Sequence, residues 1–193
     1  NGHSEIVGQL LARPDIDINK ATTDDGCTAL IMASQNGHTE IVGRLLARPD
    51  IDVNKATTDD GCTALMWASG KGHAEIVGRL LARPDIDVNK AMTNKWGSTA
   101  LIMASQNGHT EIVEKLLARP DIDVNKATTN KWGSTALTMA SEKGHTEIVE
   151  KLLARPDIDV NKGRTSDGCT ALIWASLKGH TEIAGRLLSR ADI

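Results

Sequence analysis

Aromatic residues are almost absent from this chain of 193 residues. It has no Tyr and no Phe, and its four Trp are the only large aromatic side chains. The core therefore has to be built from Leu, Ile, Val, Ala and Met. Hydrophobic residues make up 40% of the sequence, which is enough for a continuous buried seam.

Long apolar runs and a surplus of positive charge are also missing. No run approaches the ~18 apolar residues that span a bilayer, and the chain does not begin like a signal peptide, so we expect no membrane partner. The net charge is −3, with both signs dispersed along the chain. A chain without a broad basic face is not expected to bind the phosphate backbone of a nucleic acid.

Internal repetition is the dominant positive feature. Gly-His pairs recur every 35 or 36 residues, and nearly everything between them recurs as well. A period of this length indicates a solenoid of stacked units rather than one globule. The pairs are Gly2-His3, Gly37-His38, Gly72-His73, Gly108-His109, Gly144-His145 and Gly179-His180.

Cysteine is rare and occupies one position of the repeat, at Cys27, Cys62 and Cys169. Equivalent atoms of neighbouring stacked helices should lie roughly 8–10 Å apart, whereas a disulfide needs Cα atoms within about 7 Å. The odd number and this spacing predict free thiols and a reducing, cytoplasmic location.

Each unit carries the signals of two short helices. In the unit that starts at Gly26, Thr28 is a suitable N-cap for a helix over 29–35, and Asn36-Gly37 ends it because Gly adopts the left-handed conformation of a C-terminal cap. A second helix is predicted over 39–48. It should end there because Pro49, the next residue, cannot continue the hydrogen-bond ladder.

The rest of the unit predicts an arm. Residues 50–60 alternate Ile51 and Val53 with polar residues, which is typical of an extended segment or a short hairpin. Helices this short are marginal alone, so stacking of the copies has to supply the core.

Short segments of the unit also match a known pattern: Gly26-Cys27-Thr28-Ala29-Leu30, Ala33-Ser34, Gly37-His38, Glu40-Ile41-Val42, Leu45-Leu46 and Asp52-Val53-Asn54. On these residues, which recur through the whole chain, the sequence resembles the ankyrin repeat family. The resemblance implies an all-α, ankyrin-type solenoid of stacked helix pairs with short β-hairpin or extended arms. It also implies that a protein partner binds through the concave groove and the hairpin tips.

Two departures from the family pattern stand out. Each unit is about two or three residues longer than the usual ~33, through Arg-Pro-Asp-Ile-Asp and a longer tip. The family's His is also replaced, so we expect apolar packing instead of its hydrogen bonds. The replacing residues are Ile31, Met66, Ile102, Thr138 and Ile173.

The expected organisation is a single repeat domain over residues 1–193. It divides into a partial repeat, four full repeats and a C-terminal repeat, with bounds 1–25, 26–60, 61–96, 97–132, 133–167 and 168–193. Neither end is a recognisable polar cap. We expect a monomer, with end-to-end contacts through the uncapped ends as an open possibility.

The copies differ most at the turn before each unit's first Gly, which the resemblance assigns to the hairpin tips. Two tips hold an extra residue and a Trp, whereas the tip before them is acidic. Either each Trp folds back onto its own hairpin or the two form a binding hot spot. The candidate residues at the tips are Trp96, Trp132, Lys95, Lys131, Asp59 and Asp60.

Two further positions vary between copies. One carries a large apolar residue and is either a core position or a partly exposed ladder along the groove; its residues are Met32, Trp67, Met103, Met139 and Trp174. The other, at the end of the first helix, faces the groove in the family. Its candidates are Lys71, Gln106 and Glu142.

No constellation predicts catalysis. The histidines lie one repeat apart, too far to share a metal ion. Residues 50–54 resemble the start of a calcium loop, but Lys55 and Gly61 stand where the loop needs Gly and Glu. There is no catalytic triad and no phosphate-binding glycine loop. We therefore expect no enzyme activity, no cofactor and no metal.

The function expected from these observations is a non-catalytic interaction module or scaffold that binds a protein partner. Two alternatives remain open. The chain is either a purely structural, duplicated or engineered array with no evolved partner, which near-identical copies favour, or the recruitment domain of a larger enzyme.

Overall fold

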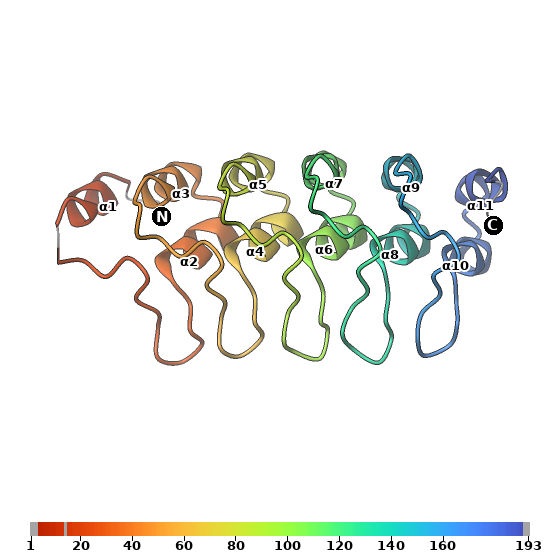
Figure 1. Ribbon diagram of the computed structural model, residues 1–193, viewed down its shortest axis with the longest axis horizontal. Coiled ribbons are helices and arrows are strands. Elements are labelled where there is room, and N and C mark those ends of the chain that lie inside the picture. The colour runs from red at the N-terminus through yellow and green to blue at the C-terminus, as the bar shows by residue number, and fades with distance from the viewer. Residues whose placement is uncertain (1–3, 14, 191–193) are drawn as a thin grey trace.

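Short helices and loops make up the part of the chain that the computed structural model describes, residues 4–13 and 15–190. The even-numbered helices form an inner row, the odd-numbered helices form an outer row, and the connecting arms project from the inner row as fingers (Figure 1). No helix among the described residues is long and apolar enough to cross a membrane. The helices are α1 (Ser4–Leu11), α2 (Ala29–Gln35), α3 (Thr39–Leu46), α4 (Ala64–Lys71), α5 (Ala74–Leu81), α6 (Ala100–Asn107), α7 (Thr110–Leu117), α8 (Ala136–Lys143), α9 (Thr146–Leu153), α10 (Ala171–Lys178) and α11 (Thr181–Leu188).

Each inner helix begins after a threonine that caps it. The Thr28 and Thr63 side chains accept a hydrogen bond from the backbone N–H three residues further on. Helix α4 ends at Gly72, whose φ of 82° is a left-handed conformation that favours glycine. The helix predicted over 29–35 is confirmed.

The outer helices bury one face, as Val42 and Leu45 of α3 show. This helix ends at Leu46, so the prediction that it extends to Arg48 is wrong by two residues. The residue before a proline avoids the helical conformation, and the Arg48 N–H bonds to the Leu45 carbonyl at 3.1 Å in a tighter turn. Pro49 therefore marks a limit that the helix does not reach.

Apolar packing replaces the family's histidine in the core. Ile31 and Met66 are fully buried at this position. Thr138 instead closes a capping box, because its hydroxyl accepts a hydrogen bond of 2.8 Å from the Thr135 N–H. Ile173, in α10, is exposed.

The arms contain isolated bridges and tight turns rather than named strands in the described residues. Ile51 and Val53 are buried, as their alternation predicts. The bridges close the base of three fingers and join Ala21 to Thr28, Ala56 to Thr63, and Ala91 to Thr99.

Arginine clamps hold successive units together and account for the Arg-Pro-Asp segment. The Arg48 Nε and Nη2 atoms donate to the Asp50 carboxylate at 3.0 and 2.9 Å. The Arg48 Nη1 atom donates to the Leu11 carbonyl of the preceding unit at 2.8 Å. The same arrangement recurs at Arg83, Arg119 and Arg155. The hydrogen bond from Arg48 lowers the pKa of Asp50 below its usual value.

Asparagine side chains form a second connection between units. The Asn54 Nδ2 atom donates to the Asp85 carbonyl at 2.6 Å, and its Oδ1 atom accepts from the Asp87 N–H at 2.8 Å. Because both ends of the amide are used, each arm is fixed to the next.

The Gly-His pairs form a third connection. The His73 Nε2 atom lies 3.2 Å from the Gln35 carbonyl of the preceding unit. The ring also passes over Gly37, where a Cβ would lie only 2.8 Å from His73 Cε1. Glycine is therefore required here for close approach as well as for its positive φ of 75°.

The two ends expose apolar side chains that the interior units bury. Leu10 of α1 is exposed, whereas its counterparts Leu45 and Leu80 are buried. At the other end, Ile173 of α10 is exposed, whereas its counterparts Ile31 and Ile102 are buried.

Candidate partner-binding groove

Counted from the N-terminus, the third finger has residues 94–96 at its tip, and this fingertip is built around Asn94. Its Oδ1 atom accepts hydrogen bonds from the Trp96 N–H at 2.8 Å and the Gly97 N–H at 3.3 Å. In the second finger, Asp60 Oδ1 accepts from the Cys62 N–H at 2.9 Å. The extra residue therefore forms a wider turn that is still hydrogen-bonded, and this turn presents the tryptophan.

The fourth fingertip has the same turn and is joined to the third. Asn130 Oδ1 accepts from the Trp132 N–H at 2.9 Å, while its Nδ2 donates to the Trp96 carbonyl at 2.9 Å. The Thr129 N–H also bonds to the Gly97 carbonyl at 3.1 Å. The two Trp fingers thus form one hydrogen-bonded edge.

Neither fingertip tryptophan is buried. Trp96 is 54% exposed and Trp132 is 39% exposed. In each case the lysine that comes before the Trp in the sequence lies over its ring. Lys95 Nζ lies 5.2 Å from the Trp96 ring centroid, and Lys131 Nζ lies 4.7 Å from the Trp132 ring centroid. These cation–π contacts hold exposed rings beside positive charge.

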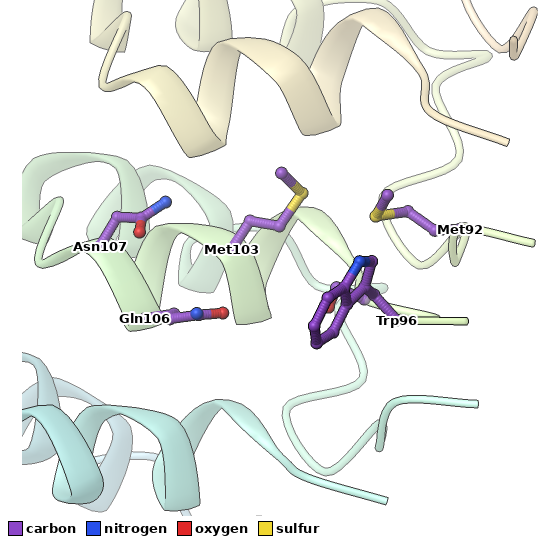
Figure 2. A pocket seen from close by; sticks show the side chains of 6 residues that line it. Met92, Trp96, Met103, Gln106 and Asn107 are labelled. Atoms are coloured by element: carbon purple, nitrogen blue, oxygen red, sulfur yellow. The ribbon is translucent and has the colours of Figure 1, made fainter. Parts of the chain in front are cut away.

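A pocket of about 290 Å³ lies between the third finger and α6. In Figure 2 the Met103 and Gln106 side chains extend from α6 on the side of the helix where the Trp96 ring lies. Methionines and an indole form apolar walls, and amides lie at the helix end. The lining residues are Met92, Trp96, Ser98, Met103, Gln106 and Asn107.

Glycine 70 makes room for one wall of this pocket. A Cβ on Gly70 of α4 would lie 2.7 Å from the Met103 Cε atom. The Gly70 carbonyl accepts a hydrogen bond of 3.0 Å from Asn107 Nδ2. Gly70, at the position that carries Gln106 in the next unit, therefore leaves this space to the Met103 methyl group.

A second aromatic cluster lies next to the fourth finger. The Arg164 guanidinium carbon lies 4.6 Å from the Trp132 centroid and 5.0 Å from the Trp174 centroid. The Arg164 side chain is only 11% exposed. We call Trp132, Arg164 and Trp174 the Trp-Arg-Trp stack.

The position predicted as either core or groove ladder is intermediate between the two. Trp67, Met103 and Met139 are partly buried and pack against the core on one side, whereas Met32 is exposed. The indole nitrogens of Trp67 and Trp174 are buried without a hydrogen-bond partner among the described residues.

The remaining candidates lie at separate places. Asp59 is exposed, whereas Asp60 is half-buried and bonds to the Thr57 hydroxyl and the Cys62 N–H. At the helix ends, Lys71 Nζ lies 5.9 Å from the Trp67 centroid, and Glu142 pairs with Lys143 at 3.7 Å. Of the predicted residues, the pocket brings together Trp96, Met103 and Gln106.

The thiols are poorly suited to nucleophilic chemistry. Burial raises the pKa of Cys62 to about 12 and that of Cys27 to about 11. Both are free, and Cys169 is free and half-buried. Among the described residues, no group of three or more His, Cys, Asp and Glu side chains is placed to hold a metal ion.

Three contributors were missed by the sequence prediction: Met92, Ser98 and Arg164. Aligning the units on their Gly-His pairs would have flagged two of them, because Met92 and Arg164 occupy a position that is Thr22, Thr57 or Thr128 in the other units.

A family model described as ankyrin repeats in three copies matches residues 1–92, 51–128, 88–164 and 124–193, which together cover the chain. The comparison with curated proteins gives no match.

Proposed function

The chain belongs to the ankyrin repeat family, and we propose that it is a non-catalytic scaffold that binds a protein partner through its groove and fingertips. Modules of this family generally mediate protein–protein interactions. The proposal places the chain in the cytoplasm, where thiols such as Cys27 and Cys62 stay reduced. It assigns no role to nucleic acids or membranes.

The observation that carries the proposal is the exposed Trp96 ring on the wall of the pocket. The Trp96 indole is 54% exposed and lies beside Met92 and Met103, so its exposed face is part of a shared apolar depression. Tryptophan is also the residue type most enriched among interface hot spots, where it packs into or beside a desolvated depression.

The pocket's size favours a protein side chain over a small ligand. Its volume of about 290 Å³ is at the lower limit of small-molecule sites, about 300–1,000 Å³. Flexible methionines such as Met92 and Met103 fit apolar side chains of varied shape. The Gln106 amide beside them can pair with a peptide backbone.

Rigid fingers also support binding. The Thr93 N–H bonds to the Asp60 carbonyl at 2.9 Å, and the Thr165 N–H bonds to the Trp132 carbonyl at 2.9 Å. Because each finger is held by its neighbour, a partner would lose little free energy in ordering them.

The test is selection of ligands from displayed random peptides of about 15 residues, which span about 50 Å when extended. Peptides enriched on the wild-type chain should lose most of their affinity for a Trp96→Ala variant. A Glu111→Ala variant, which removes an exposed side chain from the outer helix α7, should bind as the wild type does.

Two results would count against the proposal. One is the absence of any reproducibly enriched peptide, which would favour a purely structural array. The other is a set of peptides that bind the Trp96→Ala variant as tightly as the wild type.

A further inference from the structure

Arginine 164 is unusually placed for a residue in a solvated finger. Its guanidinium lies between two indoles, at 4.6 and 5.0 Å from their centroids. Its Nε atom is buried and has no hydrogen-bond partner among the described residues. The Asp167 carboxylate lies 3.9 Å from Nε, which is too long for a hydrogen bond.

Positive charge is in excess around this stack. Lys131 Nζ lies 4.7 Å from the Trp132 centroid, and Lys178 Nζ lies 5.8 Å from the Trp174 centroid. With Arg164, three cations flank two indole rings, and among the described residues Asp167 is the one acidic side chain that pairs with them. The indole N–H of Trp174 is a further buried donor without a partner.

A carboxylate would pair with the exposed edge of the Arg164 guanidinium. A planar guanidinium offers donors that match the two oxygens of a carboxylate, and indole stacking holds that plane in position. Because the donors are already held by the fold, the ligand alone has to be ordered on binding.

Arg164 and Trp174 of the stack hold the positions that Met92 and Met103 hold two units earlier, and the fingers of these units stand in one row (Figure 1). At about 8–10 Å per unit the separation is roughly 15–20 Å, which an extended chain covers in about five or six residues. Toward the other end of the row, the fingertips carry exposed Asp24 and Asp59. An acidic peptide residue would be repelled by these fingertips and attracted to the stack. The peptide should therefore bind along the groove in one orientation.

We propose that the Trp-Arg-Trp stack is a subsite for an acidic side chain of the bound peptide, whose apolar anchor occupies the Trp96 pocket about five or six residues away. This inference rests on the proposed function and adds the partner's chemistry: a linear segment with an apolar anchor and, at a set spacing, Asp or Glu.

The test compares peptides enriched on the wild-type chain with those enriched on an Arg164→Met variant. Methionine is a conservative choice, because Met92 occupies the same position of the third finger beside Trp96. Wild-type peptides should carry an acidic residue at a fixed distance from the anchor. The Arg164→Met peptides should keep the anchor and lose that preference.

A second measurement makes the pairing quantitative. For a wild-type-selected peptide, replacing the acidic residue by its amide should weaken binding to the wild type by about 10–100-fold. The same replacement should have little effect on the Arg164→Met variant. The salt dependence of binding should also be lower in this variant.

The outcomes separate the two proposals. If no peptide is enriched, or if Trp96→Ala binds the enriched peptides normally, both proposals fail. If the peptides need Trp96 but show no acidic preference, or if they bind Arg164→Met with unchanged affinity and salt dependence, the stack is structural and only this inference is overturned. Thermal unfolding of Arg164→Met identifies any loss of affinity that is caused by a loss of fold.

Discussion

Replacing Gly78 by Ala should stabilise the protein, by an amount that the structure lets us calculate. Gly78 lies inside α5, where glycine costs about 0.8–1.0 kcal/mol relative to alanine. A Cβ at this position would meet no atom within 4 Å, so it adds neither strain nor packing. The expected gain is therefore about 1 kcal/mol, or a rise in Tm of about 2–4 °C for a chain of this size.

Gly43 offers a matched comparison in the preceding outer helix. A Cβ there would lie 2.8 Å from Arg79 Nη1, and Nη2 of the same guanidinium pairs with Glu75 at 3.0 Å. Because the guanidinium has to move and a surface ion pair contributes about 0.5 kcal/mol, Gly43→Ala should gain about half as much. Urea unfolding of both variants measures the difference. No gain at Gly78 would contradict the cost assigned to glycine inside α5. An equal gain at Gly43 would show that moving the Arg79 guanidinium costs nothing.

Three further variants or treatments test other parts of the structure. Ser69→Ala should raise the free energy of unfolding in urea by about 1 kcal/mol, because the buried Ser69 hydroxyl has no hydrogen-bond partner among the described residues; a loss of stability would show that it has one. In the native protein, Cys169 should react with iodoacetamide well before Cys62, whose burial raises its pKa to about 12, and mass spectrometry of peptides would reveal the opposite order. Asp50 has a lowered pKa through its hydrogen bond to Arg48, so its stabilising contribution is present above pH ~4 and is lost as the pH falls through the native pKa. Asp50→Asn should therefore lower the urea midpoint at pH 7 and match the wild type near pH 2, and a difference that persists in acid would contradict this.

The parts of the fold that depend on local chemistry could be predicted from the sequence. Thr28 as a cap and Gly37 as a terminator define α2 because capping involves residues a few positions apart. The end of α3 could not be predicted in the same way. Arg48 leaves the helix to contact Asp50 and Leu11, and Leu11 belongs to another unit.

The candidate site was predicted in part. The length of the repeat intervals pointed to Trp96 and Trp132, and both are exposed at their fingertips. The pocket and the stack depend on contacts between units, such as Gly70 with Met103 or Arg164 with Trp132. Such contacts depend on how units stack, which no single unit's pattern contains.

The most direct test of the account is to measure stability and peptide binding together in the Trp96→Ala/Trp132→Ala double variant. Selected peptides should lose at least about 100-fold in affinity, as expected for two hot-spot residues. The free energy of unfolding should change by no more than about 1–2 kcal/mol, because Trp96 is 54% exposed and Trp132 is 39% exposed. Unfolding that becomes easier by several kcal/mol, or affinity that stays unchanged, would contradict the claim that these two residues serve binding rather than the fold.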